Sequence, residues 1–292
     1  MRTLLKTQIW RKILFGIGIL PLFCVHAEYK EKPDANTLWR EDGKNIQHGN
    51  AAYGKGWNDS RMEITALPNG EGFNFTSNSF KQNSTGRQVP VNRNYPWLSI
   101  EITASSPTKD AYKSCYANFS GNDLLAISKP EPGIWLQRIW DGTKAAPKSY
   151  FYMVIHGYSV DFKCIQVIKE PENWIRIDSD AFASKKCFEN GDTLVFTAKL
   201  AAPAEDVSVK FFDTYNTPNQ VWINGKDEIS LKPANEEKTL WKTEVKIESI
   251  KGGNPKFRRK LIFKCIVLGG KLKKPIFINN PFPYKAPPKN AK

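Results

Sequence analysis

Residues 61–76 read RMEITALPNGEGFNFT, which is two alternating segments joined by Pro68-Asn69-Gly70. Polar and apolar residues alternate in 61–67 and again in 72–76, a pattern typical of strands that bury one face. Asn-Gly between two alternating segments is a strong hairpin signal. The stretch therefore predicts a β-hairpin, and it sets the expectation for the rest of the chain.

The remainder of the chain repeats this pattern. Short alternating or apolar segments recur between turn residues, and no segment keeps the 3.6-residue apolar spacing of an amphipathic helix. Many short strands at near-regular spacing favour β-sandwiches. We predict an all-β fold of two β-sandwich domains, jelly-roll-like and then immunoglobulin-like. The further predicted strands are 97–103, 112–118, 134–139, 150–155, 158–168, 174–177, 192–200, 207–212, 220–223, 227–231, 240–247, 260–268 and 275–278.

The first 27 residues have the order of a secretory signal peptide. A basic leader precedes the apolar run Ile13–Phe23, and a small residue, Ala27, stands before the charged stretch that begins at Glu28. A lipoprotein anchored at Cys24 is the alternative, but Phe23 occupies a position where a lipoprotein signal needs a small residue. We therefore expect cleavage near Ala27 and a secreted or periplasmic protein. The apolar run is shorter than the ~20 residues that span a bilayer, so we expect no transmembrane segment.

Changes in composition divide the chain further. The last residues are rich in Pro and Lys, and a boundary between the two sets of strands falls near Ser179–Glu189. We predict a signal peptide at 1–27, an N-terminal extension at 28–54, a jelly-roll-like sandwich at 55–182, an immunoglobulin-like sandwich at 188–280 and a basic tail at 281–292.

Four cysteines remain after removal of the signal peptide: Cys115, Cys164, Cys187 and Cys265. An even number in an exported protein permits two disulfides. The pairing that we favour joins Cys115 to Cys164 and Cys187 to Cys265. The alternative is that some of them are buried thiols on strands. Their wide spacing, with no Cys-x-x-Cys pair, argues against a zinc site.

Positive charge is concentrated at the C-terminal end. All 29 acidic residues lie between Glu28 and Glu248, whereas the final 42 residues hold 12 basic residues. Such a cluster creates a field that can hold an anionic cell-surface polymer, and nucleic acid is a poor partner for an exported protein. The alternative is a solvated lysine-rich face that protects strand edges. The candidate polyanion-binding residues are Lys256, Arg258, Arg259, Lys260, Lys271, Lys273 and Lys274.

Several catalytic chemistries lack their residues in this sequence. His48 and His156 are the histidines left after residue 27, and there is no Gly-x-Ser-x-Gly elbow, phosphate loop or His-Glu-x-x-His motif. We predict no metal, no cofactor and no enzymatic activity. A glycoside hydrolase needs only two carboxylates, so glycan cleavage stays open as a less favoured alternative. Its candidate carboxylates are Glu63, Glu101, Asp141 and Asp161.

Tryptophan is abundant in the first half, and one segment combines it with polar neighbours. Residues 135–141 read WLQRIWD, so the candidate ligand-binding residues are Trp135, Arg138, Trp140 and Asp141. Exposed indole rings stack on the C–H faces of sugars, while Arg and Asp bond their hydroxyls. The alternative is that these rings are core residues, as large aromatic side chains usually are.

Two resemblances complete the sequence analysis. Trp57, the segment 69–73 and the run 97–102 make residues 55–178 similar to the jelly-roll carbohydrate-binding modules that accompany secreted carbohydrate-active enzymes. Residues 190–194 and 203–207 make the second half resemble immunoglobulin-like domains of uncharacterised exported bacterial proteins. The resemblances imply these folds and identify no functional residue.

The leading functional hypothesis is an exported, non-enzymatic protein that binds a glycan or a cell-surface polymer. A structural or surface-assembly protein is the alternative from another class. Exposed tryptophan rings favour binding, flat apolar sheet faces favour assembly, and paired carboxylates in a cleft favour cleavage.

Overall fold

The fold was obtained as a computed structural model, whose described residues all lie in one compact unit within 33–292. It describes residues 34–44, 46, 48–49, 57–58, 62–77, 84–90, 92–109, 114–119, 123–126, 130–139, 150–179, 188–215, 217–252, 261–268 and 275–279. The elements of this part of the chain are strands and one 3₁₀ turn, Pro68–Gly70. This confirms the prediction of an all-β, sandwich-like fold. Within the same residues, no helix is long and apolar enough to cross a membrane.

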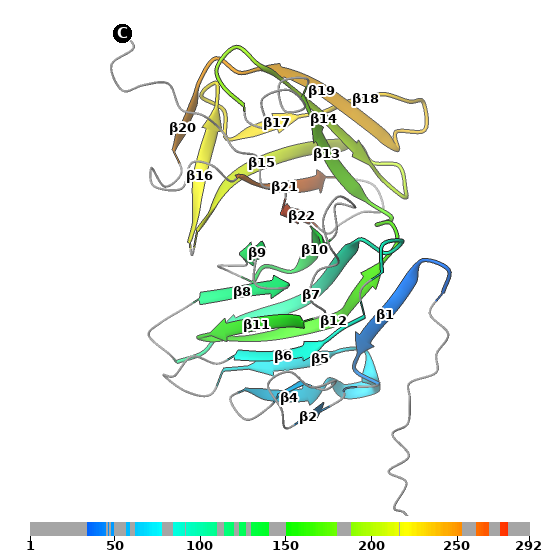
Figure 1. The fold of residues 1–292 in the computed structure, drawn as a ribbon. Coiled ribbons are helices and arrows are strands. Elements are labelled where there is room, and N and C mark those ends of the chain that lie inside the picture. The colour runs from blue at the N-terminus through cyan, green and yellow to red at the C-terminus, as the bar shows by residue number, and fades with distance from the viewer. Residues whose placement is uncertain are drawn as a thin grey trace, which may run out of the picture. The chain divides into compact units, whose positions relative to one another are not determined.

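Figure 1 shows the strands of the first half, which are labelled β1 to β13. Their bounds are β1 Thr37–Asp42, β2 His48–Gly49, β3 Trp57–Asn58, β4 Glu63–Ala66, β5 Phe73–Thr76, β6 Ser84–Gln88, β7 Trp97–Pro107, β8 Ser114–Phe119, β9 Asp123–Ala126, β10 Gly133–Arg138, β11 Tyr150–His156, β12 Tyr158–Ile168 and β13 Trp174–Asp178. The predicted hairpin is present, because β4 pairs with β5 in antiparallel register across the turn Pro68–Gly70.

The strands of the second half follow after residue 190. Their bounds are β14 Thr193–Lys199, β15 Asp206–Tyr215, β16 Thr217–Ile223, β17 Glu228–Ser230, β18 Lys232–Pro233, β19 Leu240–Lys246, β20 Ile250–Gly252, β21 Leu261–Leu268 and β22 Ile276–Asn279.

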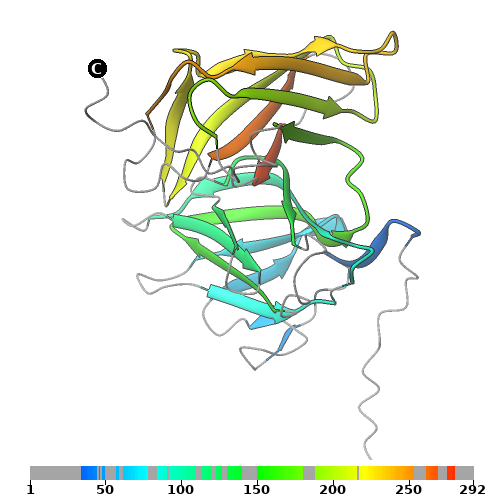
Figure 2. The same cartoon turned by 45° about the horizontal axis from the view of Figure 1, so that its top comes forward.

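Among the described residues, twelve strands from both halves form one sheet. Its order is β20-β16-β15-β21-β22-β10-β7-β12-β5-β4, with β1 also paired to β12 and β17 to β15. Two four-stranded sheets accompany it, one in the order β6-β11-β8-β9 and one in the order β13-β14-β19-β18. The link between the halves is β22, which pairs with β21 and runs parallel to β10. Figure 2 shows β21 and β22, in orange and red, next to green strands of the first half.

Two hydrophobic cores lie on opposite faces of this sheet. Successive side chains of a strand point to opposite faces. Trp135 belongs to the core that includes residues of β11, whereas its neighbour Leu136 belongs to the core that includes residues of β14 and β19. Ile276 and Phe277 divide in the same way on β22. The central strands are therefore buried on both faces, and each four-stranded sheet covers a different face. The predicted domain boundaries stay a prediction.

A bulge in β12 turns Cys164 away from the core of the first half. The register between β12 and β7 shifts on both sides of Phe162, so that Phe162 and Ile165, three residues apart, both face this core. Lys163 and Cys164 are left for the other face. Cys164 then lies opposite Glu101 on β7.

The predicted Cys115–Cys164 disulfide is wrong, because both cysteines are free, buried thiols. Cys115 on β8 points into the core of the first half, whereas the bulge directs Cys164 to the far side of the twelve-stranded sheet. The two sulfur atoms are thus separated by the sheet itself. Cys187 and the side chain of Cys265 lie outside the described residues, so their pairing stays a prediction.

A buried ion pair ties β1 to the sheet that contains β6. The backbone of β1 pairs with β12, while the carboxylate of Glu41 bonds the guanidinium of Arg87 on β6. The Arg87 guanidinium carbon lies 5.0 Å from the centroid of the Trp39 ring and 5.6 Å from that of the Trp57 ring. Burial lowers the pKa of Arg87 to about 10, so the guanidinium stays cationic at neutral pH. The ion pair therefore connects the twelve-stranded sheet, through β1, to the four-stranded sheet that contains β6.

Candidate binding face

The twelve-stranded sheet carries a group of polar side chains on the side opposite the core of the first half. On β5, Phe73 and Phe75 are buried, so Asn74 and Thr76 point the other way. The same alternation on β12 and β7 gives this side further hydroxyl, amide and charged groups. We name this group the polar face; its residues are Arg40, Asp42, Asn74, Thr76, Glu101, Ser159, Asp161, Lys163 and Gln166.

Four of these side chains form a closed hydrogen-bond network. Asn74 lies opposite Asp161, and Thr76 opposite Ser159, in the register of β5 and β12. The Asn74 amide nitrogen donates to the Ser159 hydroxyl at 2.9 Å and to a carboxylate oxygen of Asp161 at 2.6 Å. The Thr76 hydroxyl donates to the Asn74 amide oxygen at 2.5 Å and lies 2.8 Å from the Ser159 hydroxyl.

These distances decide which hydroxyl donates in the bond between Thr76 and Ser159. Because the Thr76 proton is used on Asn74, the Ser159 hydroxyl must donate to Thr76, and the bonds close into a ring. The ring holds the rotamers of all its members. A carboxylate accepts up to about four hydrogen bonds, so Asp161 keeps acceptor capacity beyond its bond to Asn74.

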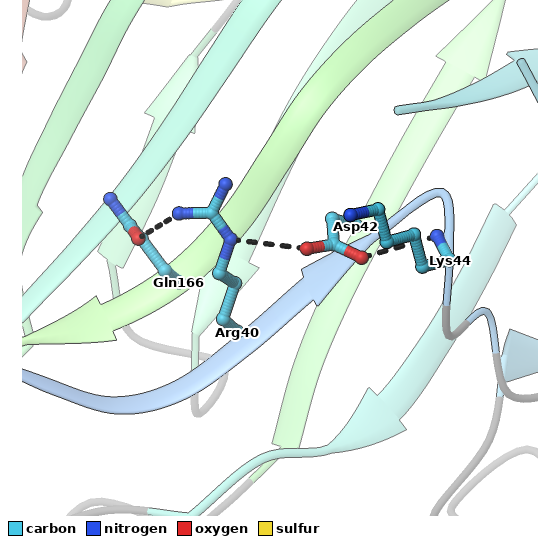
Figure 3. Close-up of polar contacts among 4 residues, drawn as sticks. All are labelled: Arg40, Asp42, Lys44 and Gln166. Carbon is cyan, nitrogen blue, oxygen red and sulfur yellow. Dashed lines mark hydrogen bonds and ion pairs between the residues drawn. The ribbon is translucent and has the colours of Figure 1, made fainter. Parts of the chain in front are cut away.

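A second polar group lies where β1 meets β12 (Figure 3). Arg40 donates to the carboxylate of Asp42 at 3.2 Å and to the side-chain oxygen of Gln166 at 3.3 Å. Asp42 also accepts a bond from the Lys44 backbone nitrogen at 3.1 Å. Guanidinium carries five N–H donors, so Arg40 retains donors after these two bonds. Its side chain is 38% exposed.

Glu101 and Cys164 lie between these two polar groups. The Glu101 carboxylate is 3.6 Å from the Lys163 ammonium nitrogen, and Asp42 and Glu101 both lie opposite Cys164 on neighbouring strands. Burial raises the pKa of Cys164 to about 11, which leaves it a neutral thiol. Burial alone would lower the pKa of Arg40, but the Cys164 thiolate, which is present only at high pH, and the Asp42 carboxylate outweigh this effect and raise it. The face therefore offers fixed charges and no nucleophilic thiolate.

The structure places the predicted ligand-binding residues in different environments. Trp135 is only 5% exposed; its ring stacks on Phe277 with centroids 3.8 Å apart, and its indole nitrogen donates to the Glu131 carbonyl. Trp135 is thus a core residue with no open ring face for a sugar. Arg138 is exposed at the end of β10. Trp140 and Asp141 lie outside the described residues, so a site built on them stays a prediction.

The remaining candidate residues lie in different parts of the structure or outside the described residues. All seven candidate polyanion-binding residues lie outside the described residues. Glu63 is exposed on β4, and β5 separates it from Asp161 on β12. His156 is buried. Among the described residues, no three His, Cys, Asp or Glu side chains gather as metal ligands would.

Sequence analysis missed most of the polar face. Arg40, Asn74 and Gln166 were not singled out, although each occupies a polar position next to apolar residues on its strand. The alternation could have assigned them to one side of their own strands. Their assembly depends on the pairing of β1, β5 and β7 around β12.

Comparison with known proteins gives weak structural similarities, among them those to two solved structures. No protein-family model matches the chain, and no curated protein matches its sequence. A crystal structure of a DUF4785 family protein from Legionella pneumophila subsp. pneumophila strain Philadelphia 1 is 12% identical with a TM-score of 0.25, and the match covers 86% of this chain and 60% of that protein. The N-terminal domain of an adhesin from Streptococcus gordonii is 11% identical with a TM-score of 0.16, covering 77% and 67%. This chain thus spans less than two thirds of the Legionella protein, and TM-scores this low carry no conclusion about function.

Proposed function

We propose that the protein is exported and binds a glycan, as part of a cell-surface polymer, through the polar face without cleaving it. The observation that carries the proposal is the closed network of Asn74, Thr76, Ser159 and Asp161. A network of this kind holds hydrogen-bonding groups in place before a ligand arrives, which reduces the entropy lost on binding.

The chemistry of the face fits a polyhydroxylated ligand. Sugar hydroxyls both donate and accept hydrogen bonds, and the face offers acceptors on Asp161 and Asp42 and donors on Arg40. Adjacent strands are about 4.8 Å apart and alternate residues on one strand are about 6.6 Å apart. Groups at these separations can bond several hydroxyls of one glycan chain.

The proposal is tested by affinity electrophoresis of the processed protein in gels that contain xylan or a soluble β-glucan. We expect retardation by a neutral polysaccharide. Asp161→Ala removes one acceptor and leaves the ring of Asn74, Thr76 and Ser159 intact, so it should weaken binding about tenfold, the effect of losing one hydrogen bond to a charged group. Asp178→Ala is the matched control, because Asp178 pairs with Arg176 on a different sheet.

Each other outcome counts against a defined part of the proposal. If no neutral polysaccharide retards the folded protein, glycan binding at this face is refuted and a structural role becomes the better hypothesis. If Asp161→Ala and Asp178→Ala bind equally well, the ligand lies elsewhere. Release of new reducing ends from the polysaccharide would refute the non-enzymatic part.

A further inference from the structure

Trp222 on β16 is the exposed large hydrophobic residue of the described part of the chain, with 38% of its surface accessible. By contrast, 5% or less of the surface is accessible in the buried tryptophans Trp57, Trp135 and Trp241. The neighbours Val221 and Ile223 belong to the core of the second half, so Trp222 points away from that core. Its exposure follows from its position on the strand.

The indole ring of Trp222 rests on the backbone of the neighbouring strand. A Cβ atom at Gly252 on β20 would lie 2.6 Å from two ring carbons of Trp222, a distance that real Cβ atoms do not reach. Gly252 also has a φ of +81°, which a side chain would strain. The glycine therefore lets the ring lie against β20.

The turn that follows β16 is held in place by the side chain of one asparagine. Asn224, in the left-handed region with φ of 53°, accepts bonds from the backbone nitrogens of Glu248 at 2.8 Å and Ser249 at 3.1 Å. Its amide nitrogen donates to the Lys246 carbonyl at 2.7 Å. These bonds hold the segment before β20 beside the end of β16. The ring and the surface beneath it are thus set in place by the fold.

A lysine lies beside Trp222 on the neighbouring strand. Lys251 lies directly opposite Trp222 in the antiparallel pairing of β16 and β20, so both side chains point to the same face of the sheet. Lys251 is exposed. It is also the first of 12 basic residues in the final 42 residues, which include no acidic residue. The last 42 residues of the sequence therefore carry a net positive charge, which favours anionic partners.

We propose that Trp222 and Lys251 form a binding site for an acidic polysaccharide. The indole face stacks on the C–H face of a sugar ring, and the Lys251 ammonium pairs with a carboxylate or sulfate group of the same or the next sugar. A neutral glycan offers the lysine hydroxyls but no opposite charge. This site is separate from the polar face, and only the choice of a polysaccharide over a nucleic acid rests on the export proposed above.

The test is titration of the processed protein with heparin, a sulfated polysaccharide, and with dextran, a neutral one, followed by calorimetry. We expect heparin binding that depends on Trp222 and Lys251, whereas any binding of dextran should not depend on these two residues. Trp222→Ala and Lys251→Gln should each weaken heparin binding about fivefold, while Trp222→Phe should recover part of the loss because it restores an aromatic face. The matched control is Lys226→Gln, which removes an exposed lysine of the adjacent turn; it should change binding less than about twofold.

Three outcomes would overturn the proposal. If heparin does not bind at low salt, there is no such site. If Trp222→Ala binds as tightly as the unchanged protein, the attraction is charge alone. If Lys226→Gln and Lys251→Gln have equal effects, the lysine opposite Trp222 has no special role. Circular dichroism of each variant checks folding, and retardation of Trp222→Ala by xylan separates loss of this site from failure of the polar face.

Discussion

Replacing Arg87 by methionine would remove one partner of an ion pair that is buried on both sides. The side chains of Arg87 and Glu41 are 5% and 2% exposed. Methionine fills much of the arginine stem volume and can still contact Trp39 and Trp57. The substitution therefore removes the charge while disturbing the packing little, and it leaves the Glu41 carboxylate buried without its cation.

The size of the effect follows from this burial. Removing one partner of a buried ion pair costs about 3–5 kcal/mol. The two ring contacts of the guanidinium, at 5.0 and 5.6 Å, add about 1 kcal/mol. We expect Arg87→Met to lower the free energy of unfolding by about 4–6 kcal/mol and the melting temperature by on the order of 10 °C. The double variant Glu41→Leu/Arg87→Met should be more stable than Arg87→Met, because no charge is left buried.

Urea unfolding of both variants, followed by circular dichroism, measures these free energies. Arg176→Met is the matched control, since Arg176 forms an exposed pair with Asp178 whose side chains are 66% and 43% accessible. Exposed pairs contribute about 0–1 kcal/mol. The reasoning is refuted if Arg87→Met costs no more than Arg176→Met, or if the two substitutions of the double variant add without coupling.

Three further predictions concern other parts of the fold. Burial raises the pKa of the thiols of Cys115 and Cys164, so neither should react with iodoacetamide in the native protein, and both should be alkylated in denaturant without reductant, as peptide mass mapping would detect. A hydrogen bond from Ser208 lowers the pKa of Glu228; the carboxylate therefore stabilises the fold above the ordinary pKa of 4.5 and loses this effect as the pH falls. Glu228→Gln should thus destabilise the protein in neutral urea titrations but not in strongly acidic ones. Gly72→Ala should lower the melting temperature, because its Cβ would lie 2.2 Å from the Phe162 carbonyl oxygen at a φ of +146°.

Local sequence patterns predicted the strands better than their partners. The hairpin of β4 and β5 was predictable because its two strands and turn are contiguous in the chain. Asn224-Gly225 also forms a tight turn, with φ of 53° and 78° and a bridge between Ile223 and Lys226; an Asn-Gly pair signals such a turn in the sequence. The strand after it, β17, pairs with β15 instead of β16. Alternation specifies which face of a strand is apolar, and it says nothing about which strand lies beside it.

The candidate binding residues show the same difference between local signals in the sequence and contacts that depend on distant strands. Trp135 was predicted to bind a ligand, yet it is buried because β10 has a core on each face. The apolar run Ile134-Trp135-Leu136 is typical of a strand buried on both sides, and this signal was available in the sequence. The position of the Trp222 ring had no such signal, since it depends on Gly252 in a strand 30 residues away.

The position of β22 has a consequence for the time course of synthesis. Ile276 pairs with Ile134, so the strand that joins the two halves of the twelve-stranded sheet is the last of the described strands. Until it emerges, β10 and β21 each lack a neighbour, and the sheet is in two pieces. Contacts this distant in sequence form slowly, and open strand edges promote aggregation. A nascent chain of this protein should therefore stay incompletely folded at least until β22 has been synthesised.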